Sequence, residues 1–472
     1  MPQSANVKVL NSYTRTASKE CKVYCPSTID QLHDIVGQLV HQSEPFCMKG
    51  GGNSFGDVFI PRHSNVIDCS GLNTITSFDS KNGRIVIQCG MQSGLLSAML
   101  LKNGRYLTGS AGSLTNTIAG DISSNVNGKD SWKYGNFSSN VVSFELLTPN
   151  GEIVRVDREH PELFWGVMGG LGMLGIITSV EVDSTLAPSN HLMVDRLVTT
   201  NLDETIRAFN SLHEDEWDFA YAWVDVLGAT PTIGRAVVEC ARFDTTKNDD
   251  SITNSFKPKS RIFGLKDSHF WYLYRGVQSA LRFTNSDRKI AAFVNAFHYH
   301  TVRMQRKQNG GIPMTSYQYP MLKALPNWNK GISNHGMQEV QMHFSEIHFS
   351  TAFFKVHALL KRYNIYPLIC AIRKHKPDNG LLSFSGNGLS FTINYDRISF
   401  PNPGACFRME RELMAIVIQF EGKVYLSKFP YVTADECAAM YAGVNDMKRL
   451  KNVLDPKNLL ASNTSSRILG FG

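Results

Sequence analysis

Hydrophobic and polar positions follow two different periods along the first part of the chain. Apolar residues recur at helical spacing between Thr28 and His41, and Ser27 or Thr28 is a suitable N-cap for that helix. Short apolar runs predict strands over 23–26, 66–69 and 83–89, and a helix is predicted over 93–102. Runs 140–148 and 152–156 flank a Pro-Asn-Gly turn and predict a hairpin. This part is strand-rich and of mixed α+β character.

After about Ser189 the pattern changes to longer alternating or apolar runs. Strands are predicted over 219–225, 236–240, 339–344 and 389–395, and helices over 350–363, 408–420 and 435–453. A chain of 472 residues favours two domains over one compact core. We therefore expect an α+β protein whose second domain is a sheet covered by helices.

Composition excludes several classes of protein. With 42% hydrophobic and 19% charged residues, the chain is of the soluble globular type, and no run of 18 apolar residues predicts a membrane span. Its N-terminus lacks the apolar core of a secretory signal, so a cytoplasmic protein is expected. The nine cysteines are dispersed, which favours free thiols over a disulfide framework, and no metal site is indicated.

The positive charge is concentrated in one segment. The formal net charge is +7, yet residues 254–307 alone hold eleven Lys or Arg and two Asp or Glu. Within 255–282 these cations alternate with aromatic residues, a mixture that suits a membrane surface, a phosphorylated lipid-linked sugar or a nucleic acid. A solvated loop followed by an ordinary helix explains the same pattern equally well.

Three glycine-rich stretches carry the main chemical signal. The first is Met48–Asp57, the second runs from Gly109 to Lys129, and the third runs from Leu163 to Val182. Glycine permits positive φ and lets backbone N–H groups approach an anion, such as the pyrophosphate of a dinucleotide. A single loop of this kind is more often only a tight turn, but three in series favour a cofactor site.

The order and spacing of these stretches resemble the PCMH-type FAD-binding domain of the vanillyl-alcohol oxidase superfamily. Within it the decaprenylphosphoryl-ribose oxidases are the most similar group, through Asn-Ser-Phe-Gly-Asp57, Ala222-Trp-x-Asp225, Tyr425-x-x-Lys428 and Asp455-Pro. The resemblance implies an FAD-binding domain over 1–190, a substrate-binding cap with an antiparallel sheet over 191–422, and a segment 423–472 that returns to the FAD-binding domain.

The resemblance also implies which residues bind the cofactor. They are Gly50, Gly51, Gly52, Asn53, Ser54, Phe55, Gly56, Ala111, Gly112, Ser113, Thr117, Gly120, Ser124, Val126, Gly128, Gly172, Ile177 and Tyr425. Many superfamily members carry a flavin-linked histidine at the position of Asn53. An asparagine cannot form that link, so non-covalent FAD is expected.

Four residues are candidates for the chemistry. Lys428 matches the family's active-site lysine and Gln341 a family glutamine near the substrate; Asn127 replaces a family histidine, and Glu339 replaces a second glutamine. Lys428 would bind the substrate hydroxyl and stabilise negative charge on the reduced ring, and the Glu339 carboxylate could accept a proton. Lys129, Ser390 and Thr392 are expected to contact the substrate, whereas His343 is better explained as a packing residue.

The expected activity is FAD-dependent oxidation of a secondary hydroxyl of a lipid-phosphate-linked or nucleotide-linked sugar to a keto-sugar. A partner reductase would then complete an epimerisation, and 255–282 could contact a membrane. One alternative is a free alditol or aldonolactone oxidase using O2; a flavin reductase fed by NADPH is another. A nucleic-acid-binding protein ranks last, because it leaves the glycine loops unexplained, so no nucleic-acid partner is expected.

Overall fold

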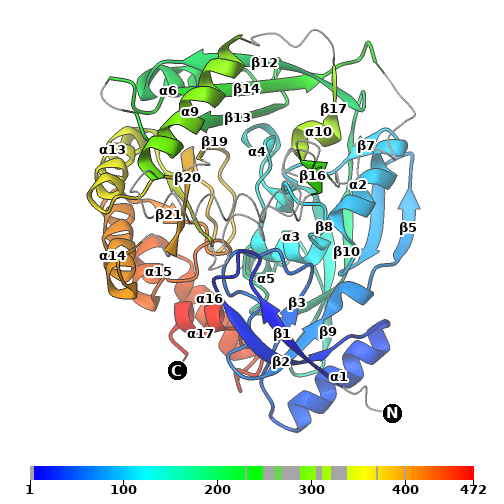
Figure 1. The fold of residues 1–472 in the computed structure, drawn as a ribbon. Coiled ribbons are helices and arrows are strands. Elements are labelled where there is room, and N and C mark those ends of the chain that lie inside the picture. The colour runs from blue at the N-terminus through cyan, green and yellow to red at the C-terminus, as the bar shows by residue number, and fades with distance from the viewer. Residues whose placement is uncertain are drawn as a thin grey trace.

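The computed structural model shows an amino-terminal unit built on two sheets and a cap built on one large sheet (Figure 1). It describes residues 5–228, 231–247, 261–262, 265–266, 287–304, 311–319, 337–367, 370–397 and 400–471. Helices and antiparallel sheets occur together, so the predicted α+β class is confirmed.

The first sheet of the amino-terminal unit has the strand order β1-β2-β4-β3. Its strands are β1 Asn6–Asn11, β2 Ser18–Tyr24, β3 Phe46–Lys49 and β4 Asn65–Asp68. Helix α1 (Ile29–His41) connects β2 to β3 and begins where predicted, because the Thr28 side chain accepts a hydrogen bond from the Gln31 backbone N–H. The apolar residues at helical spacing are the ones this helix buries.

The second sheet is antiparallel, with the order β5-β6-β10-β8-β9. Its strands are β5 Ile75–Asp79, β6 Arg84–Gln88, β8 Val141–Leu147, β9 Ile153–Asp157 and β10 Ile176–Asp183. The predicted hairpin is the β8–β9 pair. The connecting elements are α2 Ser93–Lys102, α3 Ile118–Ser124, α4 Ser131–Tyr134, α5 Pro161–Val167, the 3-10 turns Cys69–Gly71 and Phe137–Asn140, and the short pair β7 Arg105–Tyr106 and β11 Thr185–Leu186.

The cap sheet has the order β17-β12-β14-β13-β19-β20-β18-β21, and all neighbours are antiparallel. Its strands are β12 His191–Thr199, β13 Phe219–Val224, β14 Ala236–Phe243, β17 Ile312–Pro313, β18 Met337–Phe344, β19 Ala371–His375, β20 Gly388–Asp396 and β21 Lys423–Val424. Its helices are α6 Leu202–Asn210, α9 Asp287–Met304, α10 Met314–Gln318, α13 Glu346–Arg362 and α14 Pro403–Gln419. A separate ladder pairs β15 Arg261–Ile262 with β16 Leu265–Lys266.

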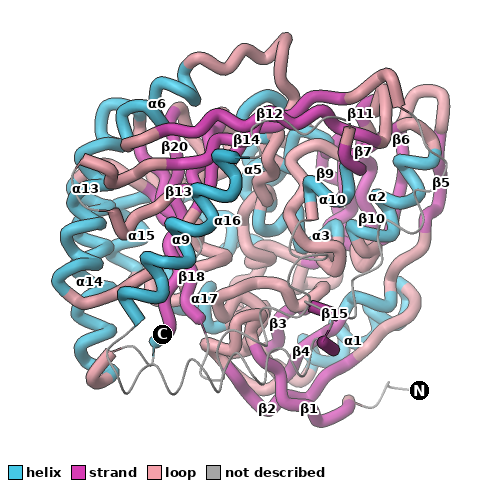
Figure 2. Tube along the Cα trace, turned by 45° about the horizontal axis from the view of Figure 1, so that its top comes forward, coloured by secondary structure: helices cyan, strands magenta, loops and turns pink. Residues whose placement is uncertain are grey.

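Helices α13 and α14 cover the outer face of the cap sheet (Figure 2). Alternate strand residues explain this arrangement, since Phe391 of β20 packs against Phe349 and Phe353 of α13. The residues between them in sequence face the opposite way, toward the amino-terminal unit.

The carboxyl-terminal segment forms α15 Ala434–Met440, α16 Val444–Leu454 and α17 Asn463–Leu469. The single helix predicted over 435–453 is therefore wrong. The backbone leaves helical geometry at Tyr441, which has a φ of −127° and a ψ of 108°. Gly443 then caps α16 and packs so closely against Leu381 that a Cβ there would be 2.4 Å from the Leu381 carbonyl oxygen. Beyond α16 the chain reaches β3, where the Phe46 N–H donates to the Leu459 carbonyl oxygen.

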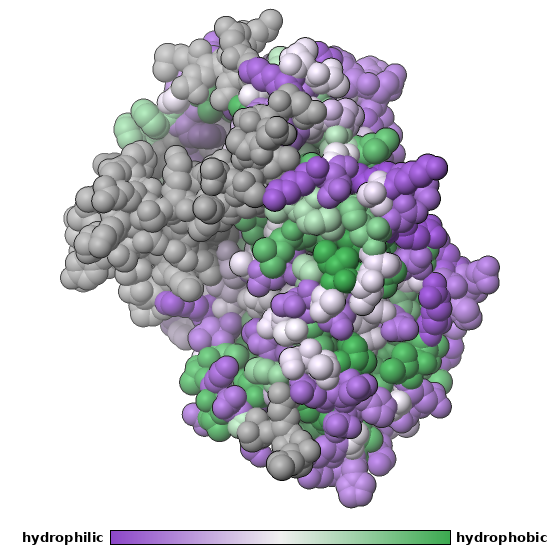
Figure 3. All heavy atoms as spheres, turned by 90° about the vertical axis from the view of Figure 1, so that its right-hand side faces the viewer, coloured by the Kyte–Doolittle hydropathy of each residue, from purple (hydrophilic) through white to green (hydrophobic). Residues whose placement is uncertain are grey.

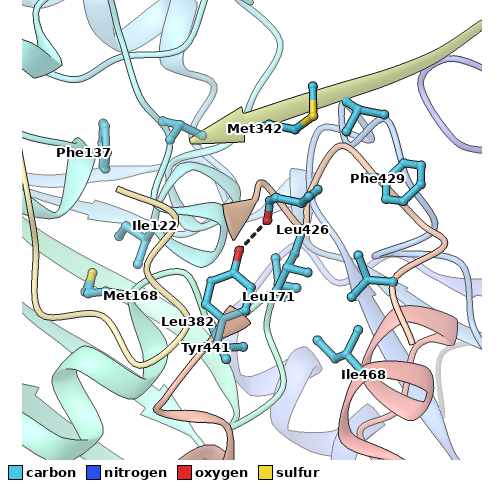
Figure 4. Close-up of a cluster of buried hydrophobic side chains, with 14 of the residues drawn as sticks. Ile122, Phe137, Met168, Leu171, Met342, Leu382, Leu426, Phe429, Tyr441 and Ile468 are labelled. Atoms are coloured by element: carbon cyan, nitrogen blue, oxygen red, sulfur yellow. Dashed lines mark hydrogen bonds between the residues drawn. The ribbon is translucent and has the colours of Figure 1, made fainter. Parts of the chain in front are cut away.

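One hydrophobic core continues through the junction between the two units (Figure 4). It joins Ile122 and Leu171 of the amino-terminal unit to Met342 of the cap and to Tyr441 and Ile468 of the carboxyl-terminal segment. Tyr441 donates a hydrogen bond to the Val424 carbonyl oxygen within this cluster. The shared core fixes the cap relative to the loops below it.

The surface carries scattered apolar side chains. Figure 3 shows hydrophobic patches among hydrophilic residues on the face that lies to the right in Figure 1. Among the described helices none is both long and apolar enough to cross a membrane.

Candidate active site

A cavity of about 410 Å³ lies between the glycine-rich loops and the inner face of the cap sheet. The cap contributes strands β18, β19 and β20, which are neighbours in the sheet although distant in sequence. Glu339 pairs with Asn394, and Gln341 pairs with Thr392. Because side chains alternate along a strand, all four face the cavity.

Most of the predicted cofactor residues line this cavity. They are Gly50, Gly51, Gly52, Asn53, Ser54, Phe55, Ala111, Gly112, Ser113, Thr117, Gly120, Ser124, Val126, Gly172, Ile177 and Tyr425. Gly56 and Gly128 are not lining residues. Gly56 packs against Pro430, and Gly128 approaches the Ser110 carbonyl oxygen, so both shape the loops from behind.

The first two glycine loops are packed against each other through backbone atoms. A Cβ on Gly50 would lie 2.2 Å from Thr117 Oγ1, and one on Gly51 would lie 2.0 Å from the Thr115 carbonyl oxygen. Only glycine permits this approach, which leaves the side of the cavity lined by main chain. In the third loop Gly172 has a φ of +71° and its Cβ position is open.

Several buried polar atoms on the cavity wall lack partners among the described residues. They are Asn53 Nδ2, Asn116 Oδ1, Gln341 Oε1 and Ser427 Oγ. A buried polar group without a hydrogen bond is costly, so these atoms indicate that a polar ligand completes the wall. A dinucleotide with many donors and acceptors fits this lining.

Lys428 and Glu339 form an ion pair in the cavity, with 2.6 Å between Nζ and Oε1. Glu339 lies on β18, and Lys428 lies in the turn after β21; Gln338 Nε2 donates to the Lys428 carbonyl oxygen and anchors that turn. Burial lowers the pKa of the Lys428 ammonium, the Glu339 carboxylate opposes this change, and Arg373 adds to it. The pair places a proton donor and a proton acceptor side by side.

Asn127 is held by a hydrogen-bond network rather than left free. Arg373 Nη1 donates to both its backbone oxygen and its Oδ1, each at 2.9 Å. Gln341 Nε2 donates to the same Oδ1 at 3.4 Å and to Ser390 Oγ at 3.1 Å. Because an arginine can only donate, Asn127 presents its oxygen and Gln341 its nitrogen to this contact.

The three predicted substrate residues lie in different places. Thr392 lines the cavity, whereas Ser390 is buried behind Gln341 and lies 2.7 Å from His375 Nε2. Lys129 is not a lining residue: its Nζ donates to the Tyr317 carbonyl oxygen and lies over the rings of Tyr221 and Tyr317. Burial lowers the pKa of Lys129 to about 7, against the opposing charge of Glu239.

His343 packs beneath the cavity. Its Nε2 donates to the Gly386 carbonyl oxygen at 3.1 Å, and its ring contacts Phe384 and His375. Burial lowers the pKa of His343 to about 4, so the ring is neutral at physiological pH. A neutral ring that does not line the cavity corresponds to the packing interpretation.

Tyr13, Arg373 and Asn394 are among the lining residues that were not predicted from the sequence. Asn394 was within reach of the pattern, since it is two residues from Thr392 on the same strand. Tyr13 lies before β2, and its ring stacks on Phe55 with 5.3 Å between centroids. No local pattern marks Tyr13 or Arg373, because their position depends on how distant segments meet.

Cysteines 47, 69 and 89 also line the cavity. Burial raises the pKa of the Cys47 thiol, and a hydrogen bond with Cys89, together with burial, raises that of the Cys69 thiol. Protonated thiols are poor nucleophiles.

Within the described part of the chain, no group of three or more His, Cys, Asp or Glu residues could hold a metal ion. The basic segment 255–282 lies outside the described residues except for β15 and β16.

Comparison with known proteins agrees with this geometry. Residues 22–157 match the model of the FAD binding domain family. The chain is 25% identical over 471 residues to decaprenylphosphoryl-beta-D-ribose oxidase of Mycolicibacterium smegmatis, covering 98% of this chain and 97% of that protein.

Two shorter similarities involve lactone oxidases. A putative D-arabinono-1,4-lactone oxidase of Neurospora crassa is 28% identical over 42% of this chain and 35% of that protein. L-gulonolactone oxidase of Bos taurus is 23% identical over 42% of this chain and 44% of its own length. The expected likeness to PCMH-type FAD-binding proteins is confirmed, and the chain is an FAD-dependent oxidoreductase.

Proposed function

We propose that the protein oxidises a secondary hydroxyl of a sugar that is linked to a lipid phosphate or to a nucleotide, and that the product is a keto-sugar. The Lys428–Glu339 ion pair carries this proposal, because it lies in the cavity bounded by the FAD-binding loops and the cap sheet. The similarity to decaprenylphosphoryl-beta-D-ribose oxidase over nearly the whole chain supports the choice of substrate class.

The ion pair assigns roles to its two members. FAD, when bound, supplies the two-electron acceptor for the carbinol C–H bond. The Lys428 ammonium holds the hydroxyl oxygen and stabilises negative charge on it as the proton leaves, and the Glu339 carboxylate takes that proton. Asn127, Gln341 and Thr392 line the same cavity and orient the sugar beside this pair.

A keto-sugar formed in this way suits a second enzyme that reduces the new carbonyl from the other face. We therefore include in the proposal a partner reductase that completes an epimerisation. Contact of the basic segment 255–282 with a membrane would bring a lipid-linked substrate to the cavity, and its mixture of cations and aromatic residues supports this.

The test begins with the absorbance spectrum of the purified protein before and after acid precipitation. The expected result is yellow cofactor released into the supernatant, since Asn53 cannot tether a flavin. Anaerobic addition of a prenylphosphoryl sugar or a sugar nucleotide should then bleach the holoenzyme. A colourless protein that does not take up added FAD would contradict the whole proposal.

The second candidate is a free alditol or aldonolactone oxidase, which the shorter similarities to two lactone oxidases favour. It predicts bleaching by small neutral polyols or lactones alone, followed by release of peroxide in air. Bleaching by glycosyl phosphates but not by these compounds would exclude it.

A further inference from the structure

Arg373 is a cation on the cavity wall that forms no direct ion pair with a carboxylate of the described residues. It projects from β19 into the cavity, and its Nη1 donates to two oxygens of Asn127. No carboxylate of the described residues lies within the 4.0 Å that defines an ion pair with its nitrogens. Burial lowers the pKa of the guanidinium, although it stays a cation.

Asp130, one of the carboxylates near Arg373, accepts a hydrogen bond from the Gly109 backbone N–H, and burial raises its pKa to about 7. Two other carboxylates of this region are paired with other cations. Glu339 is paired with Lys428, and Glu239 is paired with Arg196 at 2.7 Å. Within the described part of the chain, Arg373 therefore has hydrogen bonds to Asn127 but no direct ion-pair partner on this wall of the cavity. A partly desolvated cation without a direct counter-charge is unfavourable, so the arrangement favours an anion when the cavity is filled.

The geometry of the guanidinium suits an oxyanion. Asn127 occupies Nη1, and no hydrogen bond joins Nε or Nη2 to a described residue. The rest of the planar fork can thus donate two parallel hydrogen bonds to a phosphate or a carboxylate. Asn127 also fixes the orientation of the fork, which reduces the entropy lost on binding.

We propose that Arg373 is the binding residue for an oxyanion of the substrate, in the same cavity as the Lys428–Glu339 pair. The substrate is then an anionic sugar derivative and not a neutral polyol. This inference rests on the proposed function and adds to it the residue that selects the charged substrate. A role of Arg373 toward the cofactor alone is an outcome that the test separates.

The experiment titrates the FAD-loaded protein at constant ionic strength and follows the flavin absorbance. The probes are ribose 1-phosphate, the neutral methyl riboside and inorganic phosphate; ADP-ribose and a prenylphosphoryl ribose distinguish the nucleotide-linked from the lipid-linked source. We expect ribose 1-phosphate to bind about tenfold or more tightly than methyl riboside, in keeping with one charge-assisted bidentate contact. Arg373→Gln should remove this preference.

The neighbouring Lys374 supplies a matched control, because it lies on the same strand but does not line the cavity. Lys374→Gln should keep the wild-type preference, and Arg373→Lys, which keeps the charge without the fork, should keep part of it. If Arg373→Gln does not retain FAD, the Arg373→Lys variant tests the proposal in its place, through the part of the preference for ribose 1-phosphate that it keeps.

Equal binding of the charged and neutral probes by the wild type would overturn the proposal. An unchanged preference for ribose 1-phosphate in Arg373→Gln would also overturn the proposal, even if that variant altered the flavin reduction potential. Because these titrations need no turnover, they separate this inference from the proposed function. A phosphate preference without sugar oxidation would leave Arg373 as an anion site and reject only the reaction.

Discussion

At the scale of single residues, the cavity contains one close pair of opposite charges. Glu339, which the resemblance led us to expect in place of a glutamine, meets Lys428 at 2.6 Å. A glutamine there could position a ligand but could not accept a proton. We therefore propose that the ion pair sets the protonation chemistry of this end of the cavity.

The first prediction concerns the removal of the proton acceptor. Glu339→Gln should retain FAD but should slow anaerobic flavin reduction by about 10²–10⁴-fold, the usual contribution of a general base. Rapid-reaction absorbance measures that rate. Glu346→Gln is the control, because Glu346 is exposed at the start of α13. A variant as fast as wild type would show that the proton leaves by another route.

The second prediction concerns the pH dependence of the same step. Because burial lowers the pKa of Lys428, its ammonium should be lost at a lower pH than that of a free lysine, and the reduction rate should fall on the alkaline side. In Glu339→Gln the carboxylate no longer raises the Lys428 pKa, so the alkaline limb should move to lower pH. An alkaline limb that stays in place would assign it to another group.

At the scale of elements, the local patterns predicted what local physics determines. The helix over 93–102 has the bounds of α2, and the hairpin around the Pro-Asn-Gly turn is β8–β9. The order β19-β20-β18 could not be predicted from the chain, because these strands are joined by long connections. For that reason Lys428 and Glu339 were identified separately, their pairing was not, and Arg373 was missed.

A third prediction tests the packing of the glycine loops. Gly51→Ala should lose FAD affinity, because its Cβ would lie 2.0 Å from the Thr115 carbonyl oxygen. Gly37→Ala is a matched control within α1: nothing lies within 4 Å of its Cβ position, so it should raise the free energy of unfolding by about 1 kcal/mol. Bound FAD per chain and thermal unfolding measure the two effects. Wild-type FAD affinity in Gly51→Ala would show that the loop can yield.

At the scale of the whole molecule, one shared core makes the stability of the two units interdependent. The buried imidazoles of His343 and His375 lie in contact beneath the cavity, with 5.6 Å between ring centroids. Both pKa values are lowered by burial and by neighbouring positive charge. Protonation of either ring therefore favours the unfolded chain, where the imidazole is hydrated.

The fourth prediction is a loss of stability in acid that depends on His343. Its pKa falls from 6.5 to about 4 on folding, so between these values the unfolded state binds more protons. The contribution is complete above pH 6.5 and is lost as the pH falls to about 4, up to about 3 kcal/mol. His343→Gln should show a shallower decline in denaturant unfolding over this range. Parallel curves for the two proteins would contradict it.

The comparison with His343→Gln measures His343 together with its effect on the pKa of His375, while buried carboxyl groups act in the opposite direction in both proteins. Burial raises the pKa of Asp121 to about 6 and that of Asp130 to about 7. A raised carboxyl pKa favours the folded state as the pH falls, so these groups reduce the net acid sensitivity without changing the difference between wild type and variant.

The carboxyl-terminal segment lines the cavity with Leu460, Ala461, Ser462 and Ser465, beside loops that begin at Met48. During synthesis these four residues emerge from the ribosome after every other part of the cavity wall. The Phe46–Leu459 backbone contact can form only then. A chain interrupted before residue 459 would lack this part of the wall, so we expect its affinity for FAD to fall below that of the whole chain even where its earlier elements had folded.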